Sequence, residues 1–120
     1  MTSETEKQKK RIEKKWDEFI VEGKGCKCVS EEPWVTIAES CELVIALMRI
    51  GLEDKAKSLF DCLHQWRDED DGLYWTGYVY TDKKFWPVEK PTWTAGAVLL
   101  AADSIYKFTE ASELFLVDLT

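Results

Sequence analysis

The spacing of apolar residues predicts a first helix between Glu4 and Val21, where apolar positions recur at intervals of three and four among many charges. A Gly-Lys-Gly turn ends this helix, and residues 26–32 are predicted to form a loop. Pro33 suits the first turn of a second helix, because its missing N–H is not needed there. We expect this helix to extend to Ile50 and, since its apolar positions cover a wide arc, to be the central one.

Two further helices are predicted in the second half of the chain. Gly51 stops the second helix, and apolar residues at helical spacing predict a third one over residues 53–67, antiparallel to the second. Pro91 introduces a fourth helix, residues 93–108, whose small and apolar residues indicate burial and close packing. A short final helix is expected over residues 110–115.

A polar and aromatic stretch, residues 68–92, separates the third and fourth helices. Tyr and Trp combine an apolar face with a polar group, so a cluster of them beside carboxylates is typical of a surface that binds a sugar, a prenyl chain or another flat or extended ligand. The alternative is that these rings belong to the core. Residues 73–80 contain several strand-forming residues, which leaves room for a short β-hairpin.

These elements predict an all-α fold of antiparallel helical hairpins. We expect the 120 residues to form a charged amphipathic helix over residues 1–25 and a helical-hairpin domain over residues 26–120, with the aromatic loop at 68–92.

Charge and composition exclude several classes of function. The net charge of −7 argues against nucleic acid binding, because phosphate recognition needs clustered Lys and Arg. No apolar run approaches the roughly 20 residues of a membrane-spanning helix, and the charged amino terminus does not suit a secretory signal. We therefore expect a soluble, cytoplasmic protein with no membrane partner. The four cysteines are too few and too irregular for a disulfide framework, so reduced thiols are expected.

Four motifs stand out along the chain: Glu32-Pro33-Trp34-Val35, Asp71-Gly72-Leu73-Tyr74-Trp75-Thr76-Gly77, Trp86-Pro87 with Glu89, and Thr92-Trp93-Thr94-Ala95-Gly96. Together they resemble the carboxy-terminal part of bacterial prenyltransferase-like proteins of the α/α-toroid class. The resemblance implies a fold like that of terpene cyclases, protein prenyltransferases and six-hairpin glycosidases, of which this chain holds only the final hairpins. It also implies that the aromatic loop lies at the rim where toroids bind substrate.

Two carboxylates, Glu39 and Glu89, are candidates for a catalytic acid and base, since glycoside hydrolysis uses such a pair. The alternatives are that they bind a polar ligand, or that Glu39 only complements a helix dipole. The predicted ligand-binding residues are Trp34, Asp71, Trp75, Tyr78, Trp86 and Trp93.

Two other constellations are weaker. Asp68, Asp70 and Asp71 fit the acidic motif with which class II terpene cyclases protonate an alkene, although an acidic run before a glycine is also a common turn. The cysteines and His64 lack the spacing of a zinc site. No metal and no cofactor are predicted.

The leading hypothesis is a partial toroid, not catalytic on its own, that binds a carbohydrate-like or prenyl ligand at an aromatic and acidic rim. One alternative is a glycosidase-like or prenyltransferase-like enzyme completed by oligomerisation, and another is a structural interaction module. Because helices taken from a closed ring leave apolar edges exposed, we also expect a homo-oligomer.

Overall fold

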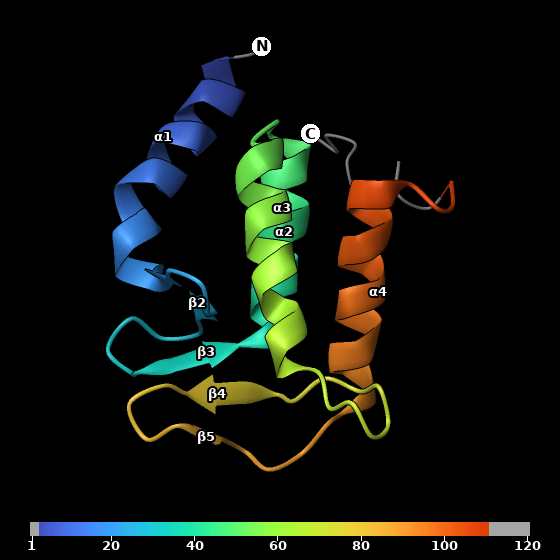
Figure 1. Cartoon of the computed structure of the whole chain (residues 1–120). Helices are drawn as coiled ribbons and strands as arrows, with labels where there is room; N and C mark the ends of the chain where they lie inside the picture. The colour runs from blue at the N-terminus through green and yellow to red at the C-terminus, as the bar shows by residue number, and fades with distance from the viewer. Residues whose placement is uncertain (1–2, 111–120) are drawn as a thin grey trace.

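The computed structural model describes residues 3–110 and shows helices standing on one side of a small sheet (Figure 1). The first half contains α1 (Ser3–Phe19), β1 (Ile20–Val21), β2 (Gly25–Lys27), β3 (Trp34–Thr36) and α2 (Ile37–Arg49). The second half contains α3 (Glu53–Leu63), the 3-10 turn η1 (His64–Trp66), β4 (Gly77–Val79), β5 (Lys84–Phe85) and α4 (Thr92–Tyr106).

The five strands form one antiparallel sheet in the order β1-β2-β3-β4-β5. β3 is central, with Thr36 paired to Cys26 of β2 and Val35 paired to Tyr78 of β4. The fold is therefore α+β, and the prediction of an all-α fold forming part of an α/α toroid is wrong.

The strands escaped the sequence analysis because each has only two or three residues, too few for an alternating pattern to emerge. Pro33 was expected to begin a helix, but its fixed φ suits an extended segment equally well. The residues after it, Trp34, Val35 and Thr36, are good strand formers and pair on both sides. The helix consequently begins at Ile37.

Other expectations agree with the structure. α2 ends at Arg49, and Gly51 follows with a φ of +84°, which a residue with a side chain rarely adopts. The hairpin expected within residues 73–80 is confirmed in part, because β4 lies there and pairs with β5 beyond it. The division at residue 25 stays a prediction. The short helix expected over residues 110–115 lies outside the described residues from position 111 onward.

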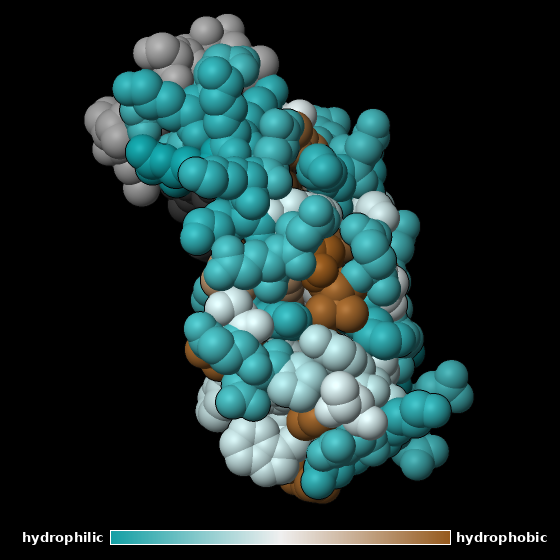
Figure 2. All heavy atoms as spheres, turned by 90° about the vertical axis from the view of Figure 1, so that its left-hand side faces the viewer, coloured by the Kyte–Doolittle hydropathy of each residue, from teal (hydrophilic) through white to brown (hydrophobic). Residues whose placement is uncertain are grey.

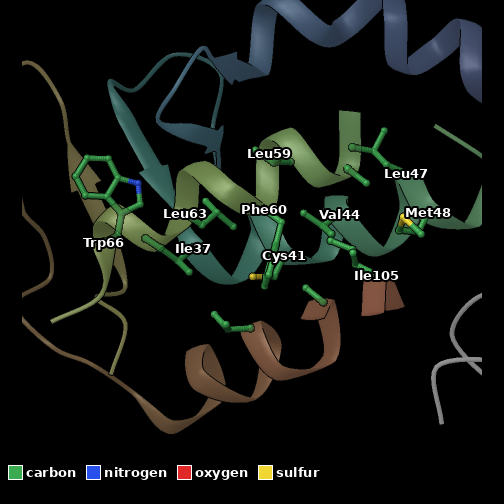
Figure 3. Close-up of a cluster of buried hydrophobic side chains, with 13 residues drawn as sticks. Ile37, Cys41, Val44, Leu47, Met48, Leu59, Phe60, Leu63, Trp66 and Ile105 are labelled. Carbon is green, nitrogen blue, oxygen red and sulfur yellow. The ribbon is translucent and has the colours of Figure 1, made fainter. Parts of the chain in front are cut away.

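The core lies where α2 packs against both α3 and α4, so the prediction that this helix is central is confirmed (Figure 3). Its members share nearly complete burial. They are Ile37, Cys41, Val44, Leu47, Met48, Ala56, Leu59, Phe60, Leu63, Trp66, Val98, Ala101 and Ile105. In contrast, α1 contributes no residue to this cluster among the described ones, and its partly buried Ile12 and Trp16 pack against it. Within residues 3–110, none of the helices combines the length and apolar character that crossing a bilayer requires.

Candidate functional site

The two faces of the sheet carry different aromatic residues. Val35, Tyr78 and Phe85 lie opposite one another in neighbouring strands, and Tyr78 and Phe85 pack against the core cluster. Because successive side chains alternate between faces, Trp34 and Trp86 project from the other face, away from the helices.

Trp34 and Trp86 contact each other on this outer face. The indole Nε1 of Trp34 donates a hydrogen bond of 2.8 Å to the backbone oxygen of Trp86. The two rings meet edge to face, with centroids 5.3 Å apart, and Trp86 stays 54% exposed. The bond to the backbone fixes the Trp34 ring, so the pair offers a preorganised aromatic surface to solvent.

A groove of about 570 Å³ lies beside this pair. Its lining combines apolar side chains with oxygen-bearing ones: Val29, Glu32, Pro33, Trp34, Val79, Thr81, Asp82 and Trp86. Figure 2 shows pale side chains, with brown and hydrophilic ones among them, at the lower end of the molecule, where the sheet lies, and further brown side chains in the middle of the same face. A groove with aromatic walls and a few polar groups is the usual form of a small-ligand site.

Trp75 and Tyr78 belong to a second aromatic cluster, between the sheet and η1. Trp75 stacks on Phe85 with ring centroids 4.6 Å apart, and Tyr78 stacks on Trp66 at 4.2 Å. Phe85 also contacts Tyr78 edge to face. These ring faces are used for internal packing, which supports the alternative that part of the aromatic stretch is core.

Lys90 forms ion pairs with two carboxylates of the acidic run at residues 68–71. The Lys90 Nζ bonds the carboxylates of Asp68, at 2.8 Å, and of Asp71, and it lies 4.8 Å from the centroid of the Trp75 ring. The hydrogen bonds from Lys90 lower the pKa of Asp68 and Asp71, and the same bonds raise the pKa of Lys90. A carboxylic acid that protonates an alkene needs a raised pKa, so that it is still protonated at neutral pH. The lowered pKa of Asp68 and Asp71 therefore favours a structural role for the acidic run, as a turn, over a role as proton donor.

The predicted acid and base lie outside the groove lining. Glu39 is exposed in the first turn of α2, and its Oε1 is 3.9 Å from the Sγ of Cys28. Glu89 is exposed just before α4, and its backbone oxygen accepts hydrogen bonds from the N–H and hydroxyl of Thr76, both at 3.2 Å. Their catalytic roles stay predictions.

Of the predicted ligand-binding residues, the groove brings together Trp34 and Trp86. Trp93 is 67% exposed at the start of α4, and it is not among the groove residues. The sequence analysis missed Glu32 and Asp82, which supply carboxylates to the groove. Recognising β3 and β4 as paired strands would have placed the loops carrying these two residues at the same end of the sheet.

The cysteines are protonated thiols at neutral pH. Burial raises the pKa of Cys26 and Cys62 to about 11 and that of Cys41 to about 12. His64 is bonded through Nδ1 to the Tyr74 hydroxyl at 2.7 Å. The described part of the chain holds no group of three His, Cys, Asp or Glu side chains placed to bind a metal ion.

Comparison with known proteins finds a similarity that covers most of the chain. The chain is 49% identical over 105 residues to the MMP endo-(1,4)-3-O-methyl-alpha-D-mannosidase of Mycolicibacterium hassiacum. The match covers 88% of this chain but 29% of that protein, so the chain spans less than a third of its curated relative. No family model matches the chain. Because the similar protein is named as a mannosidase and the fold contains a sheet, the resemblance to prenyltransferase-like toroid proteins is wrong.

Proposed function

We propose that this chain binds a mannose-type oligosaccharide in the groove beside Trp34 and Trp86, as the carbohydrate-binding part of a mannosidase-like protein. The observation that carries the proposal is the 49% identity to an endo-mannosidase over most of the chain. The groove supports it, because it offers aromatic and carboxylate groups together.

The groove residues suit a pyranose ring in three ways. The exposed indole of Trp86 offers a flat apolar surface to the C–H face of a sugar. Glu32 and Asp82 supply carboxylate oxygens that accept hydrogen bonds from sugar hydroxyls. Val29 and Val79 add apolar surface that can contact the methyl group of a methyl ether. A methyl ether has no O–H donor to leave unpaired against this surface, whereas a sugar hydroxyl has one. A partly O-methylated mannoside therefore fits better than a fully hydroxylated one.

The test is titration of the 120-residue chain with α-(1,4)-linked mannose oligosaccharides, with and without 3-O-methyl groups, followed by NMR. We expect the methylated ligand to perturb groove resonances and Trp86→Ala to weaken its binding at least ~10-fold. Phe108→Ala is the matched control, because Phe108 is an exposed aromatic residue outside the groove. Absence of binding, or equal affinity in the Trp86 variant, would refute the proposal.

A second candidate function is hydrolysis of the same oligosaccharide, which the name of the relative favours. Here Glu39 and Glu89 are the proposed acid and base. Glu39→Gln and Glu89→Gln should then abolish turnover and leave ligand affinity unchanged. If the chain binds the oligosaccharide but releases no reducing sugar, alone or at high concentration, this candidate is excluded and the binding function remains.

A further inference from the structure

We infer that a second pocket, beside η1, binds a hydroxyl-bearing sugar ring and gives the chain a sugar site separate from the groove. The inference rests on the proposed function for the class of ligand. The pocket has a volume of about 340 Å³, within the range of small-ligand sites. Each of its lining side chains carries a polar group: His64, Gln65, Arg67, Glu69 and Tyr74. In Figure 1 the chain that follows α3 runs below α4, whereas the β2–β3 and β4–β5 connections, which carry groove residues, lie at the opposite edge of the sheet.

Backbone pairing places Arg67 and Tyr74 side by side. They form an antiparallel bridge, flanked by backbone hydrogen bonds of 2.7 and 3.1 Å, and side chains of such a pair lie close together. The Arg67 Nε donates a bond of 3.1 Å to the Gly72 oxygen. A Cβ at residue 72 would be 2.9 Å from Nη2, so the glycine lets the guanidinium lie against the turn. The guanidinium is thus fixed through Nε, and its terminal nitrogens are the donors that it offers to a ligand.

His64 is oriented by two contacts. Its Nδ1 lies 2.7 Å from the Tyr74 hydroxyl, and its ring meets Phe60 edge to face, with centroids 4.8 Å apart. Burial raises the pKa of Tyr74, so the hydroxyl keeps its proton at neutral pH and serves as the donor to Nδ1. The imidazole then carries its proton on Nε2, which is the nitrogen that remains for a ligand.

Gln65 and Glu69 supply acceptors. The Gln65 Nε2 donates hydrogen bonds of 2.6 Å to the backbone oxygens of Gly23 and Cys62. Because these bonds use both N–H groups of the amide, the group that Gln65 offers to the pocket is its Oε1. Glu69 has an exposed side chain in the acidic run and adds a carboxylate.

This mixture of donors and acceptors selects a neutral, hydroxyl-bearing ligand. The charges of Arg67 and Glu69 cancel, and a phosphate or carboxylate ligand would face two acceptors with no proton to share. A sugar hydroxyl accepts a hydrogen bond from a donor and gives its own proton to an acceptor. His64, Gln65 and Arg67 are each bonded to another part of the chain, so little side-chain entropy is lost on binding.

NMR titration of the 120-residue chain with an unmethylated α-(1,4)-linked mannose oligosaccharide tests the inference. We expect the ligand to perturb resonances of residues 64–74, and Glu69→Ala to weaken this binding at least ~10-fold. Asp70→Ala is the matched control, because it removes a neighbouring exposed carboxylate that does not line the pocket, and it should leave the affinity unchanged. Equal affinity of the wild type and Glu69→Ala would overturn the inference.

A second variant, His64→Phe, keeps an aromatic ring beside Phe60 and removes both ring nitrogens. It should also weaken binding at this pocket at least ~10-fold. Unchanged resonances in the core helices identify a folded variant, and a folded His64→Phe chain that binds like the wild type would contradict the role of Nε2.

The outcomes at the two sites are separable. Trp86→Ala should leave binding at the pocket unchanged, and loss of groove binding alone would refute the proposed function while the pocket still supports this inference. A ligand that perturbs only groove resonances, or a pocket that prefers the 3-O-methylated ligand, would overturn the inference and leave the proposed function standing. Perturbation of the pocket by inorganic phosphate and not by the oligosaccharide would assign an anion site and also overturn it.

Discussion

The indole of Trp34 lies directly across the backbone of Gly77 in the neighbouring strand. A Cβ at residue 77 would be 2.3 Å from the Trp34 Nε1 and 2.8 Å from the backbone oxygen of Val35. Both distances are far below a van der Waals contact, so only glycine leaves room for the ring. The glycine thereby lets Trp34 lie flat enough to reach the backbone of Trp86.

Gly77→Ala should therefore displace the Trp34 ring and weaken both the sheet and the groove. We expect the free energy of unfolding to fall by about 1–3 kcal/mol, which is typical of an overpacked position. Urea unfolding measures the loss, and near-UV circular dichroism reports the changed environment of the tryptophans.

The matched control is Gly96→Ala in α4, where an added Cβ meets nothing within 4 Å. Alanine has the higher helix propensity, so this change should raise the free energy of unfolding by about 0.5–1 kcal/mol. Similar losses in both variants would mean that close approach of Trp34 is not the cause.

The contact between Trp34 and Gly77 also marks the limit of sequence reasoning. α1, α2 and α3 were predictable because apolar periodicity persists over eleven or more residues in each. α4 was predictable from Pro91 before it and from its run of small and apolar residues. The sheet was not, because strands of two or three residues hold too few positions to display a period. Trp34 and Trp86, 52 residues apart, meet only through the register of β3, β4 and β5. Both were predicted to bind a ligand, but their neighbours Glu32 and Asp82 depend on that register and were missed.

Cys28 should be the first cysteine to react with a thiol reagent. It is the exposed member of the four, whereas Cys26 and Cys41 are buried and Cys62 is partly buried. Partial burial and the nearby Glu39 carboxylate raise the pKa of Cys28. Replacing that charge in Glu39→Gln should lower the pKa and increase the alkylation rate at neutral pH by roughly 2- to 5-fold. Mass spectrometry of iodoacetamide-treated protein measures both effects.

The control for this prediction is Glu53→Gln, which removes a carboxylate from the start of α3. Its alkylation rate should equal that of the wild type. Labelling of Cys41 before Cys28 would contradict the prediction. It would show that the core opens often enough to expose the buried Cys41 thiol to the reagent.

Replacing Lys90 by Met should remove a pH-dependent part of the stability. The pKa of Asp68 and Asp71 is lowered in the folded chain, so their contribution is present above about pH 4 and is lost as the pH falls through the lowered values. The pKa of Lys90 is raised, so its contribution is present below about pH 10 and is lost as the pH rises through the raised value. The difference between wild type and Lys90→Met should thus be largest near neutral pH.

Urea unfolding at a series of pH values measures this difference. Lys84→Met is the control, because Lys84 pairs with Asp82 at 3.9 Å and both side chains are largely exposed, an arrangement that contributes little. A difference for Lys90→Met that is constant from acid to alkaline pH would show that its stem and ring contact, rather than its charge, stabilise the turn.

Thr36 and Thr94 should each be replaceable by valine with a gain in stability. Both side chains are buried, and their hydroxyl oxygens have no hydrogen-bond partner within the described residues. Burying an unpaired hydroxyl costs about 1–3 kcal/mol, and valine has nearly the same shape without the polar group. We therefore expect each substitution to raise the free energy of unfolding by about 1 kcal/mol.

The control is Ser40→Ala, which should lower the free energy of unfolding. The Ser40 hydroxyl donates a hydrogen bond to the Thr36 backbone oxygen and accepts one from the Cys26 N–H, and both bonds are lost in this variant. Thermal unfolding compares the stability of the three variants. A loss of stability in Thr36→Val or Thr94→Val would contradict the prediction and would indicate that the threonine hydroxyl is hydrogen-bonded to a water molecule or a ligand group.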